Sequence, residues 1–273
     1  MKRWCDRGII PTFRTSGGHR RISLEALQSF LSESERRLED PGVLGLPDLI
    51  RSRSPSIPGS KHPDQKRFRE ALAAGDEPTC RAIVQQRKQE GLSAFEVAEH
   101  LITDAMSGIG EAWQHDLVDV YQERVGCSIC SRLINELSAD IPEPAAGAPI
   151  AIGGAPSGDP YELPTMMVAL ALRESGWRAI SLGSNIPMRS FIQAAHDYEA
   201  ALVWMSLSVI DNASLFIAAQ NDLANSLDDD VVLVVGGRGL CDQTRPKLLY
   251  TAHCDSLHHL VEFATVMRSQ VNR

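Results

Sequence analysis

The sequence predicts a multidomain protein, in which a small α+β head is followed by a four-helix bundle and then by an α/β domain. Three observations support this prediction. Residues 64–139 keep a helical period throughout, and from residue 150 onward short apolar strands alternate with amphipathic helices. Residues 40–63 are rich in proline and have no sustained period, so we interpret them as a linker that follows the head.

Charge is distributed unevenly along the 273 residues. The formal net charge is −8, yet residues 1–21 carry a charge of +5, which leaves −13 on the rest. A basic block on an acidic body indicates an anion-binding head, with nucleic acid as the usual partner. There is no run of 18 apolar residues, and the basic start does not lead into an apolar signal core. We therefore expect a cytoplasmic protein that does not contact a membrane.

The head, residues 1–39, begins with a helical pattern that ends at Gly8, and a second helix begins after Ser23. Between them, two short strands flank Gly17-Gly18, a pair that can supply the positive φ values of a tight hairpin. The hairpin and the preceding helix would present basic groups to phosphates, and these are Lys2, Arg3, Arg14, His19, Arg20 and Arg21.

The string RWCDRGIIPTFRTSGGHRRIS closely resembles the winged helix-turn-helix of the MerR family, especially the branch with W-C-D-x-G-L-x-P-x-x-R-T-x-G-G-H-R-R. This resemblance implies a DNA-binding head and a homo-oligomer, a dimer or tetramer, that reads a two-fold operator. Met1 falls inside the recognition helix of that family, so the winged helix-turn-helix is truncated and lacks its first helix. We favour a true start upstream of Met1, and we expect the sequence as given to bind DNA weakly.

Four helical segments fill residues 64–140, and their short connections predict antiparallel neighbours in a four-helix bundle. The last of them contains the C-x-x-C pair Cys127 and Cys130. No second pair stands at zinc spacing and no strand precedes this one, which favours a packing role over a redox or metal role.

Residues 147–273 predict a Rossmann-like, flavodoxin-like domain, because five apolar strands alternate with helices. In such a parallel sheet, ligands bind beyond the carboxyl ends of the strands. The loops that follow residues 150–154, 203–208 and 232–237 should therefore meet at one edge.

The spacing of polar positions along that edge resembles the cobalamin-binding pattern D-x-H-x-x-G, 41 residues, S-x-L, 26–28 residues, G-G. Here DPYELP, residues 159–164, is followed by 41 residues and then Ser206, and 27 residues separate Ser208 from Gly236. The resemblance implies that the cofactor-binding positions are Asp159, Tyr161, Ser206, Gly236 and Gly237. Three residues differ from this pattern: Tyr161 stands in place of the histidine, Pro164 in place of the glycine, and Ser208 in place of the leucine.

The bundle carries a related resemblance. MerR-type photoreceptors that use adenosylcobalamin have W-x9-E-H above the cofactor, and here Trp113 is followed at that spacing by Glu123 and Arg124. The whole chain thus resembles the light-sensing, cobalamin-dependent repressors of carotenoid genes. The resemblance implies that Trp113, Glu123 and Arg124 cap a cofactor.

The substitutions weaken the expected ligation of cobalt. In the family the motif histidine binds the metal, whereas the phenol of Tyr161, with a reference pKa of about 10, must lose a proton to do so. Pro164 removes a backbone N–H and fixes φ, and Arg124 brings a charge toward an apolar ligand. We therefore predict no metal ligands, and either no cofactor or an unknown one, while the resemblance leaves adenosylcobalamin or another cobalamin open although Tyr161 replaces its histidine ligand.

These observations lead to one main interpretation and two alternatives. The main one is a MerR-like transcriptional regulator, a repressor, whose sensor module works without B12 or with another ligand. The first alternative is a corrinoid-binding light or B12 sensor, with base-on binding left open, and the second is a corrinoid carrier protein. We expect no enzyme, because no nucleophile–base pair or P-loop is present. Gly236-Gly237-Arg238-Gly239 also resembles a phosphate loop. The cluster near the last helix fits no strong metal-binding pattern, so we expect its members to be solvated; they are His253, Cys254, His258 and His259.

Overall fold

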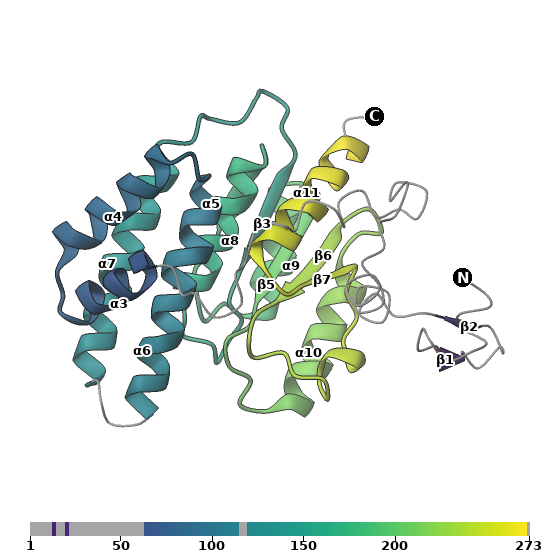
Figure 1. Cartoon of the computed structure of the whole chain (residues 1–273). Helices are drawn as coiled ribbons and strands as arrows, with labels where there is room; N and C mark the ends of the chain where they lie inside the picture. The colour runs from purple at the N-terminus through teal and green to yellow at the C-terminus, as the bar shows by residue number, and fades with distance from the viewer. Residues whose placement is uncertain (1–12, 15–19, 22–62, 115–118, 272–273) are drawn as a thin grey trace. The chain divides into compact units, whose positions relative to one another are not determined.

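A computed structural model describes residues 13–14, 20–21, 63–114 and 119–271 (Figure 1). The chain divides into two units, Met1–Ser60 and Lys61–Arg273. In the first unit, β1 (Phe13–Arg14) pairs antiparallel with β2 (Arg20–Arg21), as the two-glycine turn predicts. The rest of the predicted winged helix-turn-helix, with Lys2, Arg3 and His19, lies outside the described residues, so that part of the fold prediction has no support here.

The second unit begins with the predicted four-helix bundle. Its first two helices are α3 (Pro63–Ala73) and α4 (Glu77–Gln89), and its last is α7 (Val120–Ala139). The third runs without a break through α5 (Ala94–Val97), the π-helical segment η2 (Ala98–Thr103) and α6 (Asp104–Gln114). The bundle core is formed by buried apolar residues that include Phe68, Leu72, Ile83, Leu101, Ile129 and Leu133.

Polar residues define where the bundle helices begin. The Asp76 carboxylate accepts a hydrogen bond from the Thr79 N–H at 3.1 Å and caps α4. Ser93 and Glu96 form a capping box before α5, and Asp119 and Gln122 form another before α7. These caps satisfy the free N–H groups of the first helical turns, which explains why the connections between helices can be short.

The sheet is parallel throughout and has the order β4-β3-β5-β6-β7. Its strands are β3 (Ile150–Gly154), β4 (Arg178–Ser181), β5 (Leu202–Ser206), β6 (Val232–Gly236) and β7 (Ala252–Cys254). The alternating helices are α8 (Leu163–Glu174), α9 (Met188–Asp197), α10 (Ala213–Ser226) and α11 (Leu257–Val271), with a 3-10 turn, η3, at Arg245–Lys247. This is the predicted Rossmann-like, flavodoxin-like topology, whose order reverses between β3 and β5.

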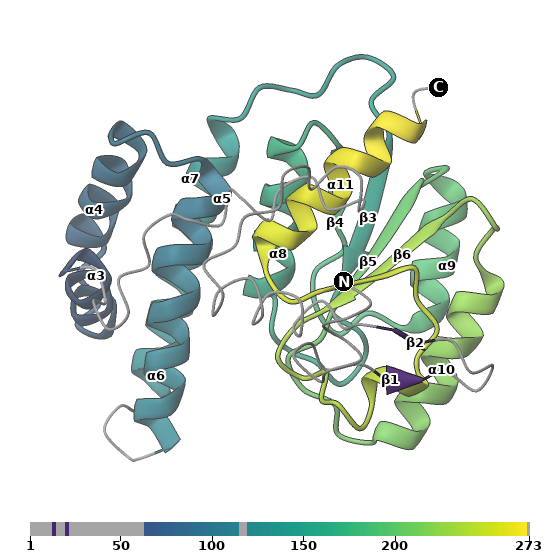
Figure 2. The ribbon, with the colours of Figure 1, turned by 45° about the vertical axis from the view of Figure 1, so that its right-hand side comes forward.

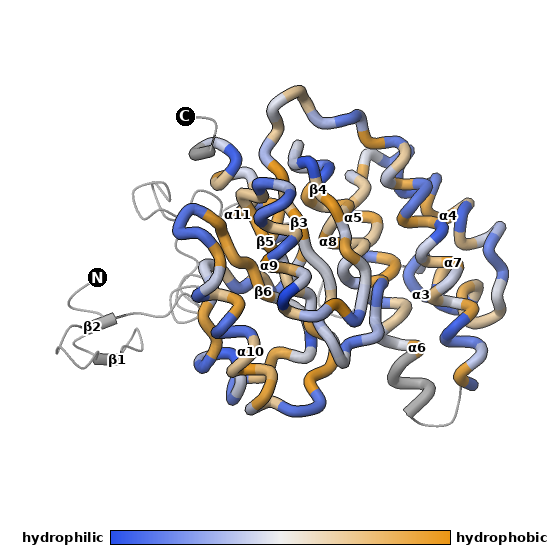
Figure 3. The backbone as a smooth tube through the Cα atoms, turned by 180° about the vertical axis from the view of Figure 1, so that it is seen from behind, coloured by the Kyte–Doolittle hydropathy of each residue, from blue (hydrophilic) through white to orange (hydrophobic). Residues whose placement is uncertain are grey.

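Helices cover both faces of the sheet (Figure 2). Helices α8 and α11 pack on the face that continues into the bundle core, and α9 and α10 pack on the other. Strand β6 (VLVVG) stands out as apolar in Figure 3, as expected for a parallel strand covered on both faces. Within residues 63–114 and 119–271, no helix combines the length and apolarity that crossing a bilayer requires.

Two carboxylates tie the third bundle helix to the sheet domain. Glu174, at the end of α8, accepts hydrogen bonds from the backbone N–H groups of Ala94 and Phe95, both at 2.8 Å. In the opposite direction, Glu99 of η2 accepts from the Leu257 N–H at 2.7 Å, at the start of α11. Each domain thus caps a helix of the other, which fixes how the bundle lies on the sheet domain.

We expect Glu174→Ala to lower the free energy of unfolding by about 0.5–2 kcal/mol, since it leaves two N–H groups of a helix start without their acceptor. Glu70→Ala is the matched control, because Glu70 is exposed and its ion pair with Lys66 spans 3.8 Å. Denaturant unfolding followed by circular dichroism measures both variants. Equal stability of the two would contradict the capping role of Glu174.

A second expectation concerns acid stability. Hydrogen bonds from Arg132 and Arg81, at 2.6 and 2.7 Å, lower the pKa of Glu77 from its ordinary value of 4.5 to about 2. Since the folded pKa is the lower one, the stabilisation is complete above pH 4.5 and is lost as the pH falls toward 2. The thermal midpoint of Glu77→Gln should therefore fall less steeply over this range than that of the wild type. If the thermal midpoints of the variant and the wild type fell equally steeply with pH, the contribution of Glu77 to acid stability would be ruled out.

Candidate functional site

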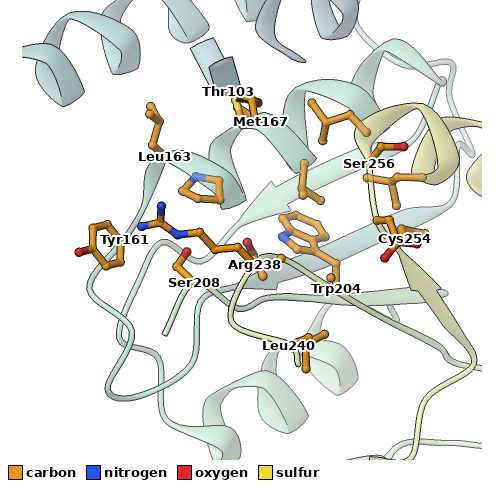
Figure 4. Close-up of a pocket in the computed structure, with 18 of the residues that line it drawn as sticks. Thr103, Tyr161, Leu163, Met167, Trp204, Ser208, Arg238, Leu240, Cys254 and Ser256 are labelled. Atoms are coloured by element: carbon orange, nitrogen blue, oxygen red, sulfur yellow. Dashed lines mark hydrogen bonds between the residues drawn. The ribbon is translucent and has the colours of Figure 1, made fainter. Parts of the chain in front are cut away.

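A cavity of about 560 Å³ lies where the carboxyl end of the sheet faces the bundle. Its upper wall comes from η2, α6 and α7, and its other walls come from α8, the strand ends and the start of α11 (Figure 4). Apolar side chains predominate in the interior and include Ile102, Met106, Met167, Val234, Leu257 and Leu260. The size and the apolar interior are typical of a site for an organic ligand or cofactor.

The loop after β3 is held in place by Asp159, which is fully buried. One carboxylate oxygen accepts from the Tyr161 N–H at 3.1 Å, and the other accepts from the Ser208 N–H at 2.5 Å and the Val209 N–H at 3.3 Å. Asp159 therefore fastens the loop after β3 to the loop after β5. Its carboxylate is occupied by backbone groups, and Asp159 is not among the residues that line the cavity.

Tyr161 is half-buried and lines the cavity. The guanidinium carbon of Arg238, from the loop after β6, lies 5.6 Å from the centroid of the Tyr161 ring. Figure 4 shows the arginine reaching across toward the tyrosine. This is a cation–π contact between two loops of the cavity rim.

Four of the five cofactor-binding positions predicted in the sheet domain line this one cavity, namely Tyr161, Ser206, Gly236 and Gly237. Gly237 has φ +110°, and a Cβ there would collide with the backbone of Leu207, so only glycine suits this position. The glycine thus lets the loop after β6 lie directly against the loop after β5 at the edge of the cavity.

The three positions predicted in the bundle have different surroundings. Glu123 of α7 lines the cavity from above, whereas Arg124 is exposed and is not a lining residue. Trp113 belongs to α6, but its side chain lies outside the described part of the chain. Cys127, one turn after Glu123, also lines the cavity, and burial raises the pKa of its thiol. Cys130 is buried in the bundle core.

Sequence reasoning missed several lining residues, and for two of them the expectation was wrong. His253 and Cys254 lie half-buried on β7 rather than in solvated positions, whereas His258 and His259 are exposed. The His253 Nε2 lies 3.3 Å from Asp255, and its Nδ1 lies 3.4 Å from an Arg245 nitrogen. Burial lowers the pKa of His253 and raises that of Cys254 to about 11. The strand pattern of residues 252–254 could have indicated that His253 and Cys254 lie on a strand of the sheet and are partly buried.

Corrinoid proteins are among the relatives of this chain. The dimethylamine corrinoid protein of Methanosarcina barkeri is 22% identical over 139 residues, which are 50% of this chain and 65% of that protein. The chain thus covers slightly less than two thirds of that relative. The structure of the Methanosarcina barkeri monomethylamine corrinoid protein superposes with a TM-score of 0.60 at 16% identity, covering 73% of this chain and 96% of that one. The structure of a methanol:cobalamin methyltransferase complex from the same organism gives a TM-score of 0.41 at 10% identity, and the match covers 91% of this chain and 93% of that chain.

These relatives correct the partner prediction. DNA, read by a homo-oligomer of this chain, is wrong as the expected partner, because the relatives of the chain are corrinoid proteins. The DNA prediction depended on the basic residues of 1–21, of which the structure describes only the hairpin strands. A cluster of positive charge is a weak guide to a partner, since it attracts many kinds of anion.

The Asp159 contacts give a test of how the site is built. We expect Asp159→Ala to cost about 1–3 kcal/mol of unfolding free energy, because it leaves three loop N–H groups without their acceptor. Asp211→Ala is the control, since Asp211 is exposed on the loop between β5 and α10. Chemical denaturation compares the two. A cost no larger than that of the control would show that Asp159 does not hold the loops together.

Two family models match the second unit, and both describe a B12 binding domain. The first matches residues 64–138, which form the bundle, and the second matches residues 149–256, which form the sheet and its first three helices. The cavity lies between these two domains. The chain therefore contains the paired B12-binding domains of a cobalamin-binding module, the bundle first and the Rossmann-like domain second.

Proposed function

We propose that this chain is a corrinoid-binding protein of the carrier type, which holds a cobalamin in the cavity and presents it to a partner enzyme such as a methyltransferase. The cavity carries the proposal, because its walls come from both B12-binding domains and its rim contains Ser206, Gly236 and Gly237. The corrinoid proteins among the relatives support the same choice.

The chemistry of the cavity lining suits the body of a corrinoid. A corrin ring is broad, flat and largely apolar, with amides at its edge. The apolar interior would contact the ring, while Ser206 and the backbone at Gly236 and Gly237 would meet its polar edge. From the bundle side, Thr103, Met106 and Glu123 would cover the ring and keep water away.

The loop after β3 does not fit as a source of a cobalt ligand. Tyr161 offers a phenol that stacks with Arg238, and Asp159 is occupied by backbone N–H groups and has no imidazole to orient. His253, the one imidazole among the described residues that line the cavity, already lies 3.3 Å from Asp255 through Nε2 and 3.4 Å from Arg245 through Nδ1. We infer that this chain binds the corrinoid through its ring and periphery, without a protein side chain on cobalt.

A bound corrinoid would supply a cobalt centre that accepts and releases carbon groups. The protein's part in such a reaction is to hold the ring, exclude water, and expose the upper face when a partner arrives. Because Glu174 and Glu99 fasten the bundle to the sheet domain, a movement of the bundle away from the sheet domain would break hydrogen bonds at both places.

The first test is retention of a corrinoid. We expect purified protein that is incubated with hydroxocobalamin and then desalted to keep a visible corrin spectrum at about one equivalent. Thr103→Trp should abolish retention, since Thr103 lies in the cavity wall beside Met167 (Figure 4). Asn135→Trp, on an exposed position of α7 away from the cavity, should retain the cofactor. Colourless wild-type protein would overturn the proposed function.

A further inference from the structure

Arg238 is a cation at the cavity rim with no anionic partner among the described residues. It is exposed and lines the cavity, and the ion pairs found within residues 63–114 and 119–271 do not include it. Arg245, the other arginine of the cavity, differs because it contacts Asp242 at 3.3 Å and His253 at 3.4 Å. Only Arg238 therefore has its guanidinium available to a ligand.

Tyr161 holds this guanidinium in place. A flexible arginine loses side-chain entropy when it binds a ligand, and stacking on a ring beforehand reduces that loss. The backbone that carries this ring is itself anchored, because the Tyr161 N–H donates to the buried Asp159. The Arg238–Tyr161 pair is thus a prepared cationic group at the rim.

The backbone around Arg238 supports the same reading. Gly237 has φ +110°, and the Gly239 N–H donates to the Leu207 carbonyl at 2.8 Å, which fixes the turn on both sides of Arg238. The sequence Gly236-Gly237-Arg238-Gly239 resembles a phosphate loop, yet no helix begins directly after it, since the next element is the short η3. A phosphate here would therefore be recognised by the arginine rather than by a helix N-terminus.

We propose that Arg238, stacked on Tyr161, binds the phosphodiester of the corrinoid's nucleotide loop. This inference rests on the proposed function, and it adds a specificity: the site distinguishes a complete cobalamin from a corrinoid without its nucleotide. The acidic groups of the cavity, Glu99, Glu123, Asp242 and Asp255, disfavour anions elsewhere in it. Because Arg238 comes from the loop after β6 and Tyr161 from the loop after β3, the pair would bring both loops to the phosphodiester.

The test compares cyanocobalamin with dicyanocobinamide, which has the corrin ring but no nucleotide loop or phosphodiester. Titration calorimetry measures both dissociation constants for the wild type, Arg238→Met, Tyr161→Phe and the control Arg178→Met, an exposed arginine on β4 outside the cavity. We expect Arg238→Met to weaken cyanocobalamin binding about tenfold or more and to change cobinamide binding less than about twofold. Tyr161→Phe, which keeps the ring, and the control should match the wild type.

The outcomes separate the two proposals. If the wild type binds neither corrinoid, the proposed function and the Arg238 inference both fall. If the wild type binds corrinoids but Arg238→Met weakens both equally, or neither, then the phosphodiester contact is wrong while the proposed function stands. A loss of cyanocobalamin binding in Tyr161→Phe equal to that in Arg238→Met would show that the hydroxyl, not the ring, matters. That result would overturn the stacking arrangement.

Discussion

The buried carboxylate of Asp159 is the interaction on which the site depends. It accepts hydrogen bonds from backbone groups on two loops, at Tyr161, Ser208 and Val209, and so sets the edge at which the cavity opens. A carboxylate that is fully buried must be matched by donors, and here the loops themselves supply them. The side chain of Tyr161 is left to face the cavity, where Arg238 meets it.

The second constraint is the mutual capping of the two domains. Glu174 caps a bundle helix and Glu99 caps α11, so these contacts, together with the apolar core that the two domains share, hold a wall from each domain at the cavity. Glu99 also lines the cavity and lies in the π-helical segment, which widens the helix by one residue at the cavity wall. Ligand contact and domain docking therefore share a residue, and binding and opening should influence one another.

The sequence predicted the fold closely where local patterns decide it. Strand–helix alternation located the strands, and the resemblance of the 41- and 27-residue spacings to the cobalamin-binding pattern placed Tyr161, Ser206 and Gly236 at one edge, where the structure has them. It could not show that His253 is half-buried or that Arg238 stacks on Tyr161, since these depend on which distant segments meet. The π-helical segment carries no recognisable sequence signal. The basic head suggested DNA, whereas the relatives are corrinoid proteins.

The central claim is that this chain keeps the corrinoid cavity but places no side-chain nitrogen on cobalt, where the family pattern has a histidine. Electron paramagnetic resonance of cob(II)alamin bound to the protein tests it most directly, because a nitrogen on cobalt splits the signal and the splitting depends on the nitrogen isotope. We expect the bound spectrum to be identical for unlabelled protein and for protein labelled throughout with ¹⁵N. A splitting that changes on labelling would place a protein nitrogen on cobalt and contradict the claim.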